Sequence, residues 1–269
     1  MNNSIDGPKT WAWLAMASAL VMSTGPANAD KLVMGVSQTF ESGDFGEATT
    51  TNIDTTTFKL SYFSGDWRSS LKLPFVSVSG VETIIPGTRG NVRGNNATTS
   101  TTSTTVISTR AGFGDAQLSL SRAFLPEHDD DLLIEWTLAA KLATADEDKQ
   151  LGSGENDYSL ALYVDREFGD WLPRLTLGYQ LTGDTPTTDY NDILFASIGT
   201  DFRVSNSTSV GLTYNQEQAT LDGADDVKSL AADFSTDLTR HTRVGLGWQK
   251  GLTDSSPDTA WSLFLSTGF

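Results

Sequence analysis

Charged side chains of several strand-like segments fall on one face, opposite the face that carries the apolar residues. If the strands closed into a barrel, these side chains would face its interior, because a charge on a lipid-facing surface costs about 2–4 kcal/mol. Opposite charges across a narrow lumen create a transverse field that orients a polar solute. They could equally pair with one another and plug the lumen. The candidate lumen and selectivity residues are Glu135, Lys141, Asp165, Arg174, Asp201, Arg203, Asp233 and Arg243.

Side chains suited to hydrolysis are sparse. The only histidines are His128 and His241, in segments predicted as short turns, and cysteine is absent. A hydrolase needs a nucleophile or an activated water with a base in reach. No G-x-S-x-G, H-E-x-x-H or phosphate-loop motif occurs. We therefore predict no catalytic residues, no metal and no cofactor, although carboxylates alone can activate water.

Segments with alternating apolar and polar residues must position the candidate residues. In Leu133–Leu142, Ile134, Trp136 and Leu138 alternate with polar or small residues, a period of two that indicates a strand. Each segment is close to the 9–11 residues of a tilted transmembrane strand. About twelve such segments follow one another: Lys31–Phe40, Thr55–Phe63, Trp67–Ser77, Asp115–Phe124, Leu133–Leu142, Tyr158–Glu167, Trp171–Thr182, Ile193–Val204, Ser209–Glu217, Lys228–Thr236, Thr242–Lys250 and Ala260–Phe269.

The connections between these segments alternate in length. Short links such as Phe168–Asp170 and Ser205–Thr208 alternate with long ones such as Ala143–Asp157. Short periplasmic turns and long extracellular loops are typical of transmembrane barrels. We predict an all-β fold: a single antiparallel up-and-down transmembrane barrel of about 12 strands. A soluble β-sandwich is the alternative, but it need not alternate its connections in this way.

Both ends of the chain favour export to the outer membrane of a Gram-negative bacterium. Lys9, the apolar run Trp11–Met22 and Ala27-Asn28-Ala29 have the layout of a signal peptide over residues 1–29, cleaved after about Ala29. A buried N-terminal helix is the alternative. Residues 30–269 would form the barrel. The last strand carries the expected barrel-closure signal, Trp261, Leu263, Leu265 and Phe269, for the barrel-assembly machinery.

The composition of the chain argues against one class of partner, and local composition predicts one long loop. A net charge of −16 and a pI near 4.3 argue against nucleic acid, which requires a basic surface. Residues 80–114 are predicted to be a long, Thr/Ser-rich extracellular loop, in which Arg89 and Arg93 could fold inward as a constriction. Pro74 interrupts the third strand, so we expect a bulge there or an earlier strand end.

The predicted strand number limits the size of the solute. Twelve strands spaced about 4.8 Å apart and tilted by about 40° give a backbone diameter of roughly 24 Å before side chains fill it. This leaves a narrow pathway for small molecules. The inward aromatic residues Tyr163 and Phe264 could stack on a ring or simply pack against the wall.

Several turn and loop motifs carry a resemblance to a known family. They include Gly112-Phe113-Gly114-Asp115, Lys141-Leu142-Ala143-Thr144, Leu151-Gly152-Ser153-Gly154, Leu177-Gly178-Tyr179, Gly223-Ala224-Asp225-Asp226, Lys250-Gly251-Leu252-Thr253-Asp254 and the closing Gly268-Phe269. From Gly112 onward the chain resembles the outer-membrane transporter-like β-barrel family named for a meta-pathway (MetA) of phenol degradation. The resemblance implies a transporter-like barrel for aromatic or other hydrophobic small molecules.

The sequence therefore predicts a porin-like channel that passes small solutes through a narrow, charged lumen. A plugged barrel with a structural or surface-interaction role is the alternative, and an outer-membrane hydrolase is the third. The expected partners are outer-membrane lipids, lipopolysaccharide, the assembly machinery and a small-molecule solute. We expect a monomer.

Overall fold

The computed structural model describes residues 12–15, 18–21, 30–81, 84–86, 91–93, 107–125 and 131–269. All regular secondary structure in these residues consists of β-strands. The described residues contain no helix long and apolar enough to cross a membrane. The strands of the barrel wall are β3 (Lys31–Gly43), β4 (Thr51–Ser64), β5 (Trp67–Val81), β8 (Ile107–Phe113), β9 (Ala116–Phe124), β10 (Leu132–Leu142), β11 (Asp157–Arg166), β12 (Trp171–Leu181), β13 (Ile193–Arg203), β14 (Thr208–Glu217), β15 (Val227–Asp237), β16 (Thr242–Gly251) and β17 (Thr259–Gly268).

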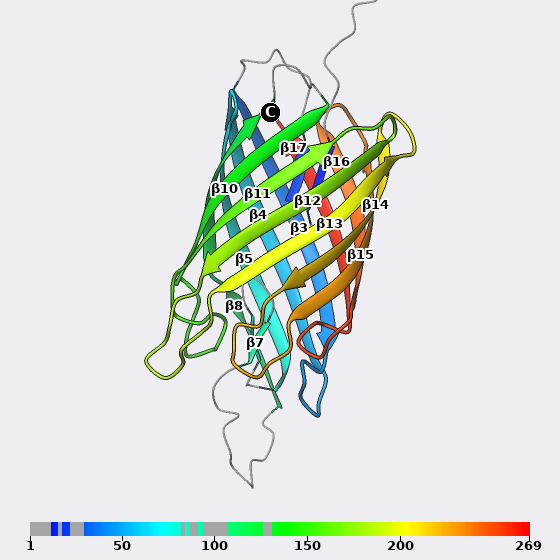
Figure 1. The fold of residues 1–269 in the computed structure, drawn as a ribbon. Coiled ribbons are helices and arrows are strands. Elements are labelled where there is room, and N and C mark those ends of the chain that lie inside the picture. The colour runs from blue at the N-terminus through cyan, green and yellow to red at the C-terminus, as the bar shows by residue number, and fades with distance from the viewer. Residues whose placement is uncertain are drawn as a thin grey trace, which may run out of the picture.

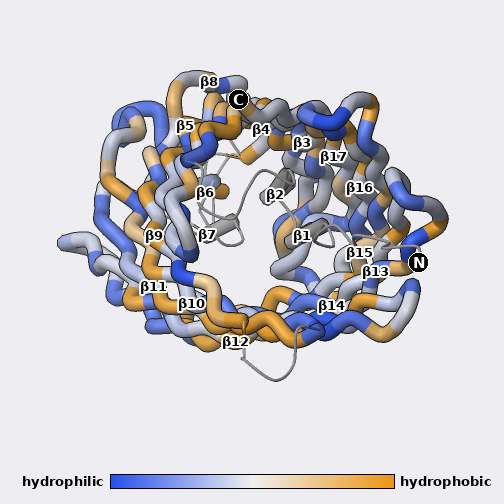
Figure 2. The backbone as a smooth tube through the Cα atoms, turned by 90° about the horizontal axis from the view of Figure 1, so that it is seen from above, coloured by the Kyte–Doolittle hydropathy of each residue, from blue (hydrophilic) through white to orange (hydrophobic). Residues whose placement is uncertain are grey.

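The wall is a closed, antiparallel twelve-stranded barrel, which confirms the predicted fold class (Figures 1 and 2). Strands β8 and β9 count as one, because they pair with successive parts of β5. Closure occurs between β17 and β3, where Leu265 lies opposite Val36. Beyond the last ladder pair, the Phe269 amide donates to the Leu32 carbonyl at 2.8 Å. A closed barrel leaves no strand edge unpaired around the ring, unlike a sandwich.

Two ends of the barrel can be distinguished by their connections. We call the end that carries Phe269 and the short connections the turn end, and the opposite end the loop end (Figure 1). At the loop end, the connection expected over residues 80–114 is shorter than predicted. Strand β5 continues to Val81 and β8 begins at Ile107, because the two pair in register from Phe75 to Val81.

Pro74 is accommodated by a bulge, but the bulge lies in the neighbouring strand and not in the third strand as expected, and β5 does not end early. Lys72 pairs with Gln117 of β9, and Phe75 pairs with Phe113 of β8. Two residues of β5 therefore face three residues, 114–116, in the partner. The Gly114 amide donates to the Pro74 carbonyl at 2.9 Å. Since proline has no N–H to donate, the extra residue restores the ladder on both sides of it.

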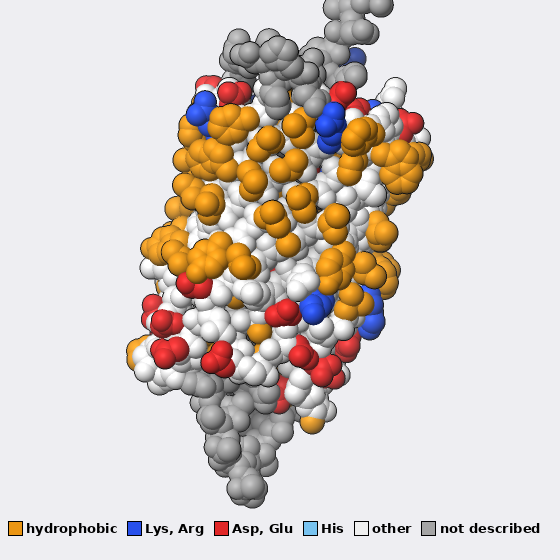
Figure 3. Space-filling view, viewed as in Figure 1, with side chains coloured by type: hydrophobic (Ala, Val, Ile, Leu, Met, Phe, Trp, Pro, Cys, Tyr) orange, Lys and Arg blue, Asp and Glu red, His pale blue; other side chains and the backbone are white. Residues whose placement is uncertain are grey.

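The outer face of the wall is apolar over most of its height. In Figure 3, hydrophobic side chains cover this band, and charged side chains gather toward its ends. Outward residues such as Leu177, Leu212 and Leu263 are at least half exposed. Aromatic pairs lie near the strand ends, including Trp67 with Trp136, whose ring centroids are 5.6 Å apart, and Trp171 with Phe202. Such bands and aromatic girdles are typical of barrels that cross a bilayer.

Four short strands are not part of the barrel sheet and form two separate pairs. Strand β6 (Ile84–Pro86) pairs with β7 (Asn91–Arg93). Strand β1 (Ala12–Ala15) pairs with β2 (Ser18–Val21), and β2 lies beside β16 and β17. The remainder of the predicted signal peptide, like most of residues 82–106, falls outside the described residues.

Candidate functional site

Two cavities lie inside the barrel. The turn-end cavity has a volume of about 160 Å³, and the loop-end cavity a volume of about 450 Å³. Lys59, Arg68 and Tyr163 line both of them and therefore mark their junction. The turn-end cavity is also lined by Glu135, Asp165, Arg174, Asp233 and Phe264, and the loop-end cavity by Glu41, Lys72, Gln117, Lys141, Asp157, Glu217 and Gln249.

Most candidate lumen residues converge around the turn-end cavity. Together with Arg68, which was not among the predicted residues, they form a set that we call the charge belt: Arg68, Glu135, Asp165, Arg174, Asp201, Asp233 and Arg243. Acids and bases alternate along much of it. Arg68 forms an ion pair with Glu135, and Arg174 Nη2 lies 3.0 Å from Asp201 Oδ1. Asp165 lies opposite Arg174 in the β11–β12 ladder. Buried carboxylates and guanidinium groups compensate each other's desolvation only through such pairing.

Arg243 is held in the belt chiefly by hydrogen bonds that it donates to serine hydroxyl groups. Its Nη2 donates to Ser235 Oγ at 2.7 Å and to Ser209 Oγ at 3.1 Å. Asp237 Oδ1 lies 3.6 Å from its Nη1. Arg243 and Asp201 are both buried and line neither cavity, so they act on the lumen through their neighbours.

The remaining two candidates lie away from the belt. Lys141 is at the loop end, where its Nζ is 2.9 Å from Asp157 and 3.7 Å from Asp115. Arg203 is near the turn-end rim, pairs with Glu167 at 2.8 Å and has a 41% exposed side chain. It lines neither cavity, because β13 ends at this residue.

A glycine makes room for two carboxylates of the belt. Gly211 of β14 lies between Asp201 of β13 and Asp233 of β15 in the two ladders. A Cβ at Gly211 would overlap a carboxylate oxygen of each. Both acids therefore lean over the glycine, and Asp233 Oδ2 is buried without a hydrogen bond from the described residues. The sequence pattern placed both acids inward but did not reveal this contact.

Two inward phenylalanines lie against glycines of the neighbouring strands. Phe264 faces Gly245 across β16–β17, and Phe195 faces Gly178 across β12–β13. A Cβ on either glycine would collide with the facing ring. The rings therefore lie over the glycine backbone along the wall. Each ring shields the glycine backbone from solvent, an arrangement that is known as aromatic rescue of a glycine in a β-sheet. Phe195 was not among the predicted residues, although its inward position follows from the period of two.

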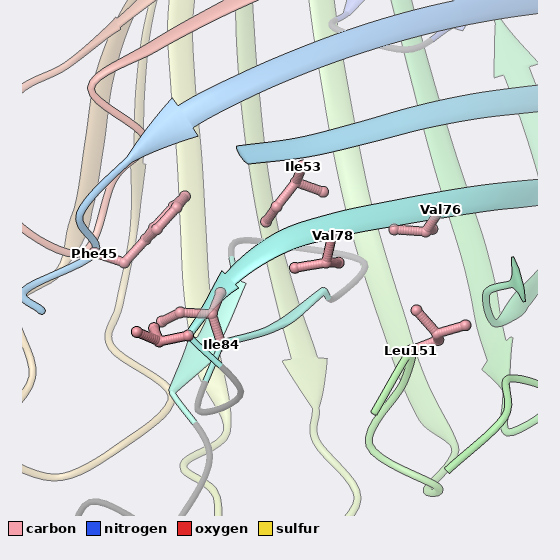
Figure 4. Close-up of a cluster of buried hydrophobic side chains, with 7 residues drawn as sticks. Phe45, Ile53, Val76, Val78, Ile84 and Leu151 are labelled. Atoms are coloured by element: carbon pink, nitrogen blue, oxygen red, sulfur yellow. The ribbon is translucent and has the colours of Figure 1, made fainter. Parts of the chain in front are cut away.

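An apolar cluster lies inside the wall near the loop end. It joins Ile53, Val76 and Val78, which point inward from β4 and β5, to loop residues such as Leu151 (Figure 4). Phe45, Val81 and Ile84 complete it. The cluster was not predicted from the sequence, because the loops were expected to be solvated. The sequence pattern that could have indicated the cluster is the pair of inward valines Val76 and Val78, because the inward positions of the other strands are mostly polar.

Asp115 anchors the loop that carries Leu151. Its Oδ1 accepts the amides of Thr144 at 3.0 Å and Ala145 at 2.9 Å. Lys141 extends from the end of β10 toward the same carboxylate and also donates to Ser153 at 2.8 Å. The bulge opposite Pro74 is the feature that brings Asp115 to this position. We call residues 143–156, which follow β10, the anchored loop.

No constellation suited to hydrolysis is formed by the described residues. His241 lies in the turn between β15 and β16, and His128 and Arg89 fall outside the described residues, as does the side chain of Arg93. No group of three His, Cys, Asp or Glu in the described part of the chain is arranged to hold a metal ion. The described side chains that line the cavities offer charged groups and the aromatic rings of Tyr163 and Phe264 to a solute.

Comparison with known proteins relates the fold to outer-membrane channels. An outer-membrane channel from Pseudomonas putida F1 superposes with a TM-score of 0.68 at 13% sequence identity, over 92% of this chain and 97% of the channel. The KdgM porin superposes with a TM-score of 0.53 at 10% identity, over 87% of this chain and 99% of the porin. No protein-family model and no curated protein matches the chain. At these identities the similarity is one of fold.

Proposed function

We propose that this protein is an outer-membrane channel that passes small solutes through its charged lumen. The observation that carries the proposal is the pair of cavities that meet at Lys59, Arg68 and Tyr163 inside a closed barrel. The apolar outer band and the aromatic pairs support a membrane location. In this orientation the turn end faces the periplasm and the loop end faces the outside.

The surroundings follow from the same proposal. Lipid tails cover the apolar band, and the sugars and phosphates of lipopolysaccharide lie beside the acidic loop end. The strand that ends at Phe269 presents outward Trp261, Leu263 and Leu265 to the assembly machinery. The proposed channel functions as a monomer, since the twelve wall strands of one chain enclose the lumen by themselves.

The proposed solutes are small molecules with an aromatic or otherwise hydrophobic body. Two observations favour them. Tyr163 and Phe264 line the turn-end cavity, and the sequence resembles a family named for phenol degradation. The solved structure with the TM-score of 0.68 is described as an outer-membrane channel, in agreement with transport.

A plugged, structural barrel is the second candidate. The ion pairs of the charge belt and the apolar cluster near the loop end both narrow the lumen. Single-channel recording of the refolded mature protein in a planar bilayer distinguishes the two. Discrete conductance steps that small phenols reduce would support the channel. A correctly folded barrel that stays silent in the presence of every solute would contradict it.

A further inference from the structure

The inward face of β4 and β5 carries a group of cations at the junction of the two cavities. Lys59 and Lys72 lie directly opposite each other in the β4–β5 ladder, and Arg68 is on the same face of β5. Directly opposed residues have Cβ atoms about 4.5–5.5 Å apart, and like charges at such a position destabilise the sheet. Lys59 in this register is therefore better accommodated when an anion lies beside it.

Three other inward bases that line the cavities have acidic partners. Arg174 pairs with Asp201, Arg68 with Glu135, and Lys141 with Asp157. Lys59 forms no ion pair or hydrogen bond within the described part of the chain, where its charged neighbours are Lys72, Arg68 and Glu135. The junction therefore presents one base that has no partner acid among the described residues.

The acids of the loop-end cavity are too distant to neutralise Lys59. Glu41 lies opposite Ile53, six residues before Lys59 along β4. At about 3.3 Å per residue this places Glu41 about 20 Å away along the strand. Glu217 ends β14 at the same rim. At this distance the rim acids leave the charge of Lys59 available to a solute.

The turn-end cavity next to this cation has the size of one ring. Its volume of about 160 Å³ is close to that of an apolar protein cavity of about 150 Å³ that takes up benzene. Tyr163 and Phe264 line it together with Lys59. An aromatic ring in this cavity would place a substituent of one or two atoms toward the junction.

From these observations we propose that Lys59, assisted by Lys72, binds the carboxylate of a small aromatic acid whose ring lies beside Tyr163 in the turn-end cavity. The inference builds on the proposed channel function and names its solute class. Carboxylate hydrogen bonds to an ammonium group are charge-assisted and stronger than neutral ones. A neutral aromatic of the same size would lack them.

Calorimetric titration of the detergent-folded mature barrel tests the site without relying on conductance. The probes are benzoate, benzyl alcohol and acetate, and the variants are K59Q, K72Q and Y163L. Lys250, an exposed residue on the outer face of β16, provides the matched control K250Q. We expect K59Q to weaken benzoate binding about tenfold, as loss of a charged hydrogen bond does. We expect K72Q to weaken it less, and K250Q to leave it unchanged. Y163L should weaken benzoate and not acetate.

Equal benzoate affinity of K59Q and the unmodified protein would overturn the proposal. So would benzyl alcohol binding as tightly as benzoate, or acetate binding as tightly as benzoate, because these results remove the charge or the ring from recognition. Conductance separates this inference from the channel function. A silent barrel that binds benzoate through Lys59 contradicts transport and retains the site. A conducting barrel in which K59Q has no effect retains transport and overturns the site.

Discussion

The ring of Phe264 lies over the bare backbone of Gly245 in the neighbouring strand. The pair lies where β16 and β17 form part of the turn-end cavity wall, and Phe264 itself lines that cavity. The free width of the lumen therefore depends on a glycine that allows an aromatic ring to lie along the wall.

Replacing Gly245 with alanine should narrow the lumen. The new Cβ would collide with the Phe264 ring, so the ring must turn into the turn-end cavity. Overpacking of this kind costs about 1–3 kcal/mol. We expect a lower single-channel conductance and a lower denaturation midpoint. Gly35→Ala is the matched control, since its Cβ would meet its nearest atom at an ordinary 3.6 Å. Equal conductance of the two variants would contradict the arrangement.

Gly211→Ala should destabilise the barrel by driving the carboxylates of Asp201 and Asp233 apart. Its Cβ would overlap an oxygen of each, and we expect a loss of about 1–3 kcal/mol in the free energy of unfolding. The measurement is denaturant unfolding in detergent of G211A, D233A and the double variant. Because D233A removes one obstructing carboxylate, the two effects should be less than additive. Strict additivity would show that Gly211 and Asp233 are independent.

Replacing Arg174 with glutamine should lower the free energy of unfolding much more than replacing Arg203 with glutamine. Arg174→Gln leaves Asp201 buried without its partner, which costs about 3–5 kcal/mol. In the Arg203–Glu167 pair the arginine side chain is 41% exposed and the glutamate 8%. Its loss should therefore cost less than loss of the Arg174–Asp201 pair, in which both side chains are at most 10% exposed. Reversal potentials in a salt gradient should also shift for R174Q only, since Arg174 lines the turn-end cavity. A larger shift in R203Q would place the selective charge at the rim.

Asp115→Ala should release the anchored loop. The carboxylate accepts two backbone amides at its start, and without them Leu151 loses its fixed position in the apolar cluster. We expect faster proteolysis within residues 143–156 and altered current noise. Asp146→Ala provides the control, because Asp146 pairs only locally with Lys149, at 3.1 Å on the exposed surface. Cleavage at the same rate in both variants would show that Asp115 does not hold the loop.

The sequence by itself determined the faces of the strands and the class of fold. An alternation with period two decides which side chains point inward, so Glu135, Asp165, Arg174, Asp201, Asp233 and Arg243 could be placed inside before any contact was known. The alternating connection lengths determined that neighbouring strands are antiparallel, and Pro74 indicated a bulge because it lacks an N–H.

Only the tertiary structure decided which of these residues meet. Pairing depends on strand register and on the space between side chains, which local periodicity does not contain. The closeness of Asp201 and Asp233 arises from the absent side chain of Gly211, and the position of Phe264 arises from Gly245. The inward course of the anchored loop depends on Asp115, which the bulge opposite Pro74 brings into place. Arg203 is a further example. The period of two places it on the inward face, but β13 ends at this residue, so its side chain lies at the rim.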